Sequence, residues 1–361
     1  MARPDPLLLD TARRLLRTVA DPQGRRAGDE AAARRAVWQA VEDGGLTRAW
    51  IAEAAGGAGG GLVDGFAILT LAGEVALDVP LAETLLAGWM LAAVGIELPA
   101  GVLVPIAGPG ALALVEGQLR NRATRVAFAR EAGHFVVCAS RAGAGYVALV
   151  DAAACRIEPR DNLAGEPRDT VVCDGVAPVA VAAAPLDVAD WLHTMGAVAR
   201  ACQMAGALQA ILARSVAYAG ERVAFDRPIG KFQAIQHALA RLAGETAAAL
   251  AASGSAADAL ATAAERVAPA RPAAGDDLDA ILLEVASAKI RVGEAAAAGA
   301  AIAHQVHGAI GFSTEHPLHR FTRRLWAWRD DYGSETEWAA RLGAHVAARG
   351  ADALWPMLAA R

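Results

Sequence analysis

Residues 221–239 read ERVAFDRPIGKFQAIQHAL, and residues 305–324 read QVHGAIGFSTEHPLHRFTRR. Both stretches interrupt long helical patterns. Pro228 precedes a helix that we expect to begin at Gln233, because proline is accepted in turns and first helical turns but not in a helix interior. Gly308 follows an Ala-rich helical run, and glycine lets the backbone turn or approach a large ligand closely. The two stretches therefore predict loops at the ends of long helices.

Helical periodicity continues on both sides of these loops. Apolar residues recur at the i, i+3, i+4 spacing of an amphipathic helix. The predicted helices cover residues 188–219, 233–267, 276–307, 317–329 and 334–349. Their lengths and short connections are typical of an antiparallel bundle. We therefore expect a C-terminal four-helix-bundle domain over residues 187–361.

The first part of the chain is also helical, and the middle is not. The same periodicity predicts helices at residues 6–19, 29–42, 63–77 and 80–95, which form an N-terminal helical domain over residues 1–101. Between residues 102 and 186, short apolar runs alternate with Gly, Pro, Asp and Asn, a pattern typical of a small β barrel or sandwich. The expected fold class is α+β and mostly α, with a central small β-barrel domain over residues 102–186.

Composition excludes several classes of protein. Hydrophobic residues make up 55% of the chain, which argues against disorder. The net charge of −5, with both signs interspersed, predicts neither nucleic-acid nor membrane-surface binding. The four cysteines lack C-x-x-C spacing, so we predict no metal site. The N-terminal residues carry charges in place of an apolar signal core, and the expected location is cytoplasmic.

The two stretches quoted above resemble the C-terminal domain of acyl-CoA dehydrogenases. That family usually shows R-x-x-F-G-x-P-I-x-x-F-Q-x-x-Q-H in the first place and Q-x-x-G-G-x-G-[FY] in the second. The resemblance implies an FAD-dependent oxidoreductase that introduces an α,β double bond into a CoA thioester, in fatty acid or steroid side-chain metabolism. It also implies a homo- or hetero-oligomer, a dimer or tetramer, and an electron-transfer flavoprotein as the electron acceptor.

The resemblance also implies a set of FAD-binding residues. Arginine and glutamine at the matching positions of the family reach the FAD of a neighbouring subunit, and a guanidinium suits a pyrophosphate. Ser334 and Thr336 retain hydroxyls where the family's flavin-binding Thr-x-Glu lies. Carried over to this sequence, the cofactor-binding residues are Arg222, Phe225, Gln233, Gln305, Gly308, Ser334 and Thr336.

The sequence departs from the family at the catalytic base. Alignment from Gln305 places Tyr332 where most members have glutamate, and Gly196 at the position that a smaller branch uses. A phenol, with an ordinary pKa of about 10, is not a ready base at neutral pH. Asp331 is the best substitute for the missing carboxylate. We therefore expect Asp331 to be the catalytic residue of an enzyme whose usual glutamate is missing.

Two alternatives remain open. Some family members are heterotetramers whose two subunit types contribute unequally to the site, and a chain without the base fits a non-catalytic partner subunit. Related proteins also include flavin monooxygenases and nitroalkane oxidases, so other flavin chemistry on the same fold is the third possibility. The fold does not distinguish among these functions.

Overall fold

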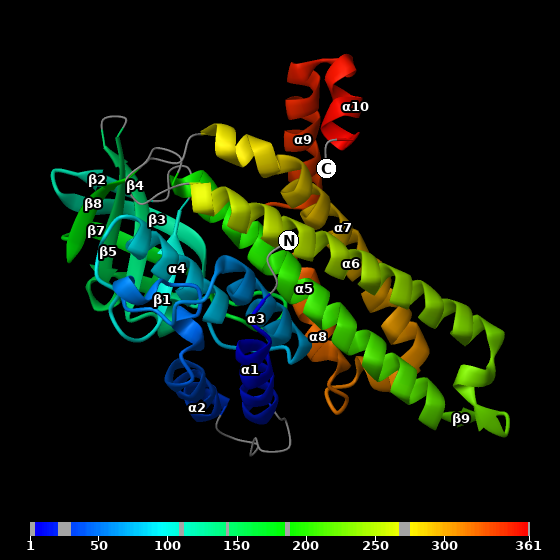
Figure 1. Cartoon of the computed structure of the whole chain (residues 1–361). Helices are drawn as coiled ribbons and strands as arrows, with labels where there is room; N and C mark the ends of the chain where they lie inside the picture. The colour runs from blue at the N-terminus through cyan, green and yellow to red at the C-terminus, as the bar shows by residue number, and fades with distance from the viewer. Residues whose placement is uncertain are drawn as a thin grey trace.

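The computed structural model describes residues 4–20, 30–107, 112–141, 144–184, 188–266 and 275–359. Helices come first, strands follow, and helices complete the chain (Figure 1). The first four helices are α1 (Pro6–Val19), α2 (Glu30–Asp43), α3 (Leu62–Glu74) and α4 (Leu81–Ala93). The strands run from Leu103 to Ala184, and the next helix begins at Val188. The mostly helical α+β class is confirmed; the exact domain limits stay a prediction.

Eight strands form two four-stranded sheets. We call the first sheet A, with the order β1 (Leu103–Ile106), β4 (His134–Arg141), β5 (Ala144–Asp151) and β8 (Ala180–Ala184). The second is sheet B, with the order β2 (Ala113–Val115), β3 (Gln118–Ala127), β7 (Arg168–Val176) and β6 (Arg156–Glu158). Strands β1 and β4 are parallel, and the other neighbours are antiparallel. Among the described strands the two sheets do not close, so the central unit is a sandwich and not the expected barrel.

Sheet A is buried on both faces. Alternate side chains of a strand point to opposite faces. Phe135 and Val137 of β4 belong to the apolar core between the sheets, and Val136 belongs to the core of the helices. Helix α4 packs on this second face beside β1. Thr84 fixes the contact, because its hydroxyl donates to the carbonyl of Leu103 at 3.1 Å and accepts from the same residue's amide at 3.2 Å. The first turn of α4 is therefore held against sheet A.

The remaining helices form the bundle that runs from the centre to the right of Figure 1, with α9 and α10 at the top. Its members are α5 (Val188–Glu221), α6 (Gln233–Arg266), α7 (Gly275–His307), α8 (Leu318–Trp328), α9 (Glu335–Arg349) and α10 (Ala351–Ala359). A two-residue hairpin, β9 (Val223–Ala224) and β10 (Arg227–Pro228), joins α5 to α6. Helix α5 is the central member, since it packs against α3, α6, α7 and α8. No helix in the described ranges is long and apolar enough to cross a membrane.

Candidate active site

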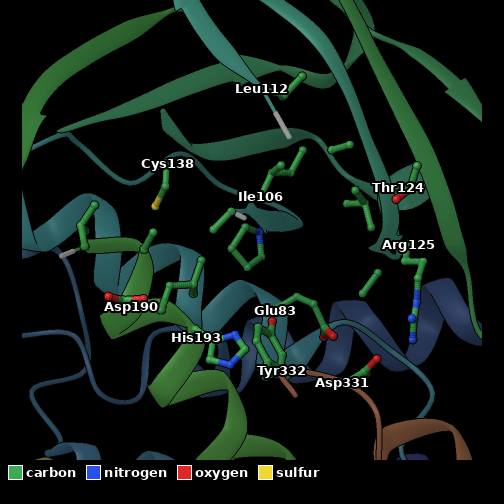
Figure 2. A pocket seen from close by; sticks show the side chains of 18 of the residues that line it. Glu83, Ile106, Leu112, Thr124, Arg125, Cys138, Asp190, His193, Asp331 and Tyr332 are labelled. Atoms are coloured by element: carbon green, nitrogen blue, oxygen red, sulfur yellow. The ribbon is translucent and has the colours of Figure 1, made fainter. Parts of the chain in front are cut away.

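A cavity of about 970 Å³ opens between the sandwich and the helices (Figure 2). Strands β1, β3 and β4 line one side of it, with Ile106 and Cys138 among their side chains. The first turn of α4, the N-terminal half of α5 and the loop after α8 line the other side. Elements that are far apart in the sequence thus surround one space. We call Glu83, Arg200, Asp331 and Tyr332, which lie together on the helical side, the cavity floor.

Arg200 holds the carboxylates of the cavity floor together. Its Nη2 donates to Oε1 of Glu83 at 2.5 Å, and its Nε donates to Oδ2 of Asp331 at 3.0 Å. Its Nη1 donates to Gln203 at 2.6 Å. Burial opposes the charge of this guanidinium, but Glu83 and Asp331 outweigh that effect and raise the pKa of Arg200. Arg200 is therefore a fixed cation beneath the cavity.

Asp331, the predicted base, lines the cavity but carries a second ion pair. Arg168 Nη2 donates to the same Oδ2 atom at 2.7 Å. Burial of Asp331 favours the neutral acid, yet the charges of Arg168 and Arg200 and the hydrogen bond from Arg168 outweigh it and lower the pKa. A carboxylate stabilised in this way is a weaker base. The catalytic role of Asp331 stays a prediction.

Tyr332 occupies the space that either family base would need. A Cβ atom added at Gly196 would lie 2.4 Å from the ring of Tyr332, so the two alternative base positions touch each other. The backbone of Tyr332 is left-handed, with φ of 55°, and Trp338 Nε1 donates to its carbonyl at 2.9 Å. Burial, chiefly, raises the pKa of this phenol far above its usual value. Tyr332 is therefore neutral at physiological pH.

Two arginines, one from a strand and one from a helix, add positive charge to the cavity lining. Strand β3 has a register shift against β7 between Ala123 and Val126, and Arg125 in this bulge has φ of 60°. Arg125 lines the cavity together with Arg341 of α9, whose guanidinium lies over the Trp338 ring. Within the described chain neither arginine forms an ion pair with a carboxylate. Two unneutralised cations fit an anionic ligand.

The predicted cofactor residues fall into two groups. The first group, which we call the Arg222 group, is exposed at the free end of the bundle, near the β9 label of Figure 1. Its members are Arg222, Phe225, Gln233, Gln305 and Gly308. Stacking of Tyr218 on His307, with ring centroids 4.6 Å apart, brings the two loops together there. Asp226, which replaces the family's usual glycine, adopts the left-handed conformation with φ of 61°.

The second group lies beside the cavity. Ser334 lines an adjoining pocket of about 430 Å³ and caps α9, since its hydroxyl accepts from the backbone amide of Glu337 at 3.4 Å. Thr336 is exposed in the first turn of α9. The Arg222 group lies roughly 30 Å from Arg200, because the intervening residues of α5 rise by about 1.5 Å each. A single chain therefore places the two groups at different sites.

Sequence reasoning missed three residues of the site: Glu83, Arg168 and Arg200. A signal was present for two of them. Glu83 is the sole charged residue among residues 81–93, and Arg200 is the sole one among residues 191–213. A charge inside a buried helix needs a partner of opposite sign. Which partner it finds depends on packing between distant segments, and the sequence pattern does not contain that information.

Comparisons with known proteins agree with this architecture. The family model for the C-terminal domain of acyl-CoA dehydrogenases matches residues 186–329. The acyl-CoA dehydrogenase FadE27 of Mycobacterium tuberculosis is 29% identical, over 87% of this chain and 88% of FadE27. The acyl-CoA dehydrogenase IpdE2 of Mycolicibacterium smegmatis is 27% identical, over 96% of this chain and 100% of IpdE2. Among solved structures, a chain of the ChsE4–ChsE5 complex from Mycobacterium tuberculosis matches with a TM-score of 0.79 and 25% identity, over 94% of this chain and 96% of that chain.

Proposed function

We propose that this chain, a member of the acyl-CoA dehydrogenase family, oxidises a CoA thioester to its α,β-enoyl product. The observation that carries this proposal is the cavity between the sandwich and the helices, whose lining combines the carboxylates of Glu83 and Asp331 with the guanidiniums of Arg125 and Arg341. A base and an anion-binding surface on one cavity suit proton removal from a bound thioester.

FAD is the cofactor of this family, and the residues present fit it. The exposed guanidinium of Arg222 suits the pyrophosphate of a cofactor bound mainly by a neighbouring copy, with Phe225, Gln233, Gln305 and Gly308 beside it. Arg125 and Ser334 would hold the part that enters this chain's own cavity. When bound, FAD supplies the acceptor for the hydride that leaves the β-carbon.

The chain's own residues have three tasks in this reaction. Apolar side chains such as Ile106 and Leu112 line the cavity and exclude water from the acyl group. Arg125 and Arg341 offer positive charge to phosphates of the ligand. A carboxylate of the cavity floor takes the proton from the α-carbon. We propose an electron-transfer flavoprotein as the protein that reoxidises the enzyme.

A second candidate function, a non-catalytic partner subunit, has two observations in its favour. The ring of Tyr332 fills the space at both family base positions, and Asp331 is neutralised by two guanidiniums. In this alternative the chain contributes the Arg222 group to a different subunit that carries the base. The two functions differ in whether this chain alone can oxidise a thioester.

Product analysis separates the two candidates. The purified chain is supplied with FAD, ferrocenium as electron acceptor, and a panel of butyryl-CoA, octanoyl-CoA and a steroid side-chain CoA thioester. The proposal predicts a product two hydrogens lighter by mass spectrometry, formed by the chain alone. No product from any thioester would contradict the proposal, and a product that forms only after co-expression with a base-containing homologue would establish the partner function.

A further inference from the structure

Glu83 brings a carboxylate into the cavity from α4, a helix on which the sequence predicts no catalytic base. It is 2% exposed to solvent and lies in the first turn of the helix. The contacts of Thr84 with Leu103 hold this turn against sheet A. Figure 2 shows Glu83 beside Tyr332 and Asp331 on the cavity floor. A carboxylate therefore lies next to the residue that occupies the family's base position.

The two carboxylates of the cavity floor are held differently. Both guanidiniums donate to Oδ2 of Asp331, from Arg168 at 2.7 Å and from Arg200 at 3.0 Å. Glu83 receives one donor, Arg200, through Oε1. Its Oε2 accepts no hydrogen bond from any described residue, while the side chain lines the cavity. Glu83 thus keeps a free oxygen for a substrate proton, whereas Asp331 anchors the loop.

The groups around Glu83 suit a carboxylate and include no competing base. A helix N-terminus stabilises a negative charge in its first turn, and Arg200 adds a fixed cation. Tyr332 beside it has its pKa raised, principally by burial and further by the charge of Glu83, so the phenol cannot serve as the base. The neighbouring Gly196 has no side chain to contribute. Among these groups, Glu83 is thus the one that offers a carboxylate oxygen to the cavity.

We propose that Glu83 is the catalytic base of this chain, and this inference rests on the proposed dehydrogenase function. In the step, the α C–H bond of the thioester breaks and its proton bonds to Oε2 of Glu83. The electron pair of that bond stays on the thioester as an enolate, so charge and atoms balance without an oxidant. Arg200 holds Oε1 and keeps the carboxylate turned toward the cavity. Tyr332 packs the space where the loop glutamate of other members would lie.

Exchange of the α-protons for deuterium tests the step directly, since it needs no net oxidation. The FAD-loaded oligomer is incubated in D₂O with butyryl-CoA, octanoyl-CoA and a steroid side-chain CoA thioester, and the α-proton signal is followed by NMR. Glu83→Gln preserves an acceptor for Arg200, which keeps Asp331 as its counter-charge, so we expect the variant to fold and to bind FAD and thioester. Its exchange rate should fall at least about 100-fold. Glu83→Asp retains the charge but places it farther from the substrate, so its exchange rate should fall by less. The exposed Glu97→Gln is the control and should exchange at the normal rate.

The outcomes distinguish a failure of the Glu83 inference from a failure of the proposed dehydrogenase function. If the wild-type protein exchanges and oxidises a thioester while Glu83→Gln exchanges equally fast, Glu83 is not the base and the dehydrogenase function stands. Loss of exchange in Asp331→Asn together with full exchange in Glu83→Gln would likewise overturn the inference. If the wild-type protein neither exchanges nor oxidises any of the three thioesters, the proposed function fails and the inference fails with it.

Discussion

Charged side chains buried beneath the cavity form one connected network. Glu166 is one member of it: Arg324 Nε donates to its Oε1 and Trp328 Nε1 donates to its Oε2, both at 3.0 Å. Arg168 lies 3.6 Å from Glu166 and joins this group to Asp331. Each charged member of this network therefore meets an opposite charge, and removal of one partner leaves the other less compensated. The network connects α8 and β7 to the loop that carries Tyr332.

Asp331→Asn should destabilise the protein strongly at neutral pH. Two guanidiniums lose their shared counter-charge, and we expect the free energy of unfolding to fall by about 3 kcal/mol in urea titrations. Because the pKa of Asp331 is lowered from 3.8, its contribution is present above about pH 4 and is lost as the pH falls further. The exposed Asp174→Asn, whose partner Arg120 is 3.7 Å away, should cost almost nothing. Equal costs for the two variants would contradict this account of the network.

Lys289 supplies a test at alkaline pH. Burial, partly opposed by Asp331 and Glu335, lowers the pKa of its amine from 10.5 to about 8. Between these values the unfolded chain keeps a proton that the folded chain has released, so the free energy of unfolding should rise with pH across that window. Thermal melts of the wild type and of Lys289→Met from pH 7.5 to 10 measure the effect (about 3 kcal/mol at most). An identical pH dependence of the two proteins would refute it.

Helices were largely predictable from the sequence, and strands less so. The 3.6-residue period places α5, α6 and α7 within two residues of their observed ends. Strand β3 begins seven residues before the expected run at 125–128, because its outward side chains are charged and hide the apolar alternation. Helix α10 was not predicted, since Pro356 lies inside it. The cavity floor was beyond prediction, because its contacts join residues more than 100 positions apart.

The crossing of α3 and α5 depends on two glycines. A Cβ at Gly206 would lie 1.9 Å from the carbonyl oxygen of Thr70, and one at Gly73 would lie equally close to that of Gln203. Gly206→Ala must separate the helix backbones, and we expect a loss of about 2 to 3 kcal/mol in unfolding free energy. Gly220→Ala on the same helix meets nothing within 4 Å and should cost nothing. Chemical denaturation of both variants checks this, and an unchanged Gly206→Ala would disprove the close packing.

At the scale of the whole molecule, two separated regions carry the family's features. The cavity lies beside the sandwich, and the Arg222 group lies at the free end of the bundle (Figure 1). Large apolar side chains are exposed at that end, with Phe225 at 89% and Phe312 at 72%. Exposed aromatic residues next to polar ligand-binding groups are typical of an interface between subunits. The arrangement therefore favours an oligomer in which one copy completes the FAD site of another.

Replacement of both aromatic residues should break this assembly. We expect Phe225→Ser with Phe312→Ser to lower the mass measured by analytical ultracentrifugation and to release FAD, because the cofactor loses the Arg222 group of its neighbour. Leu7→Ser, at a side chain that is 80% exposed on α1, is the matched control and should change neither property. A doubly substituted protein with unchanged mass and FAD content would show that this end of the bundle is not the interface.

The central claim, that this chain is an FAD-dependent acyl-CoA dehydrogenase, is tested most directly by its visible absorption spectrum under anaerobic conditions. The purified oligomer is titrated with butyryl-CoA, octanoyl-CoA and a steroid side-chain CoA thioester in turn. The account predicts a flavin absorption band that bleaches with at least one of the three, as the cofactor accepts two electrons. A protein that binds no flavin, or whose flavin band keeps its full intensity with all three, would contradict it.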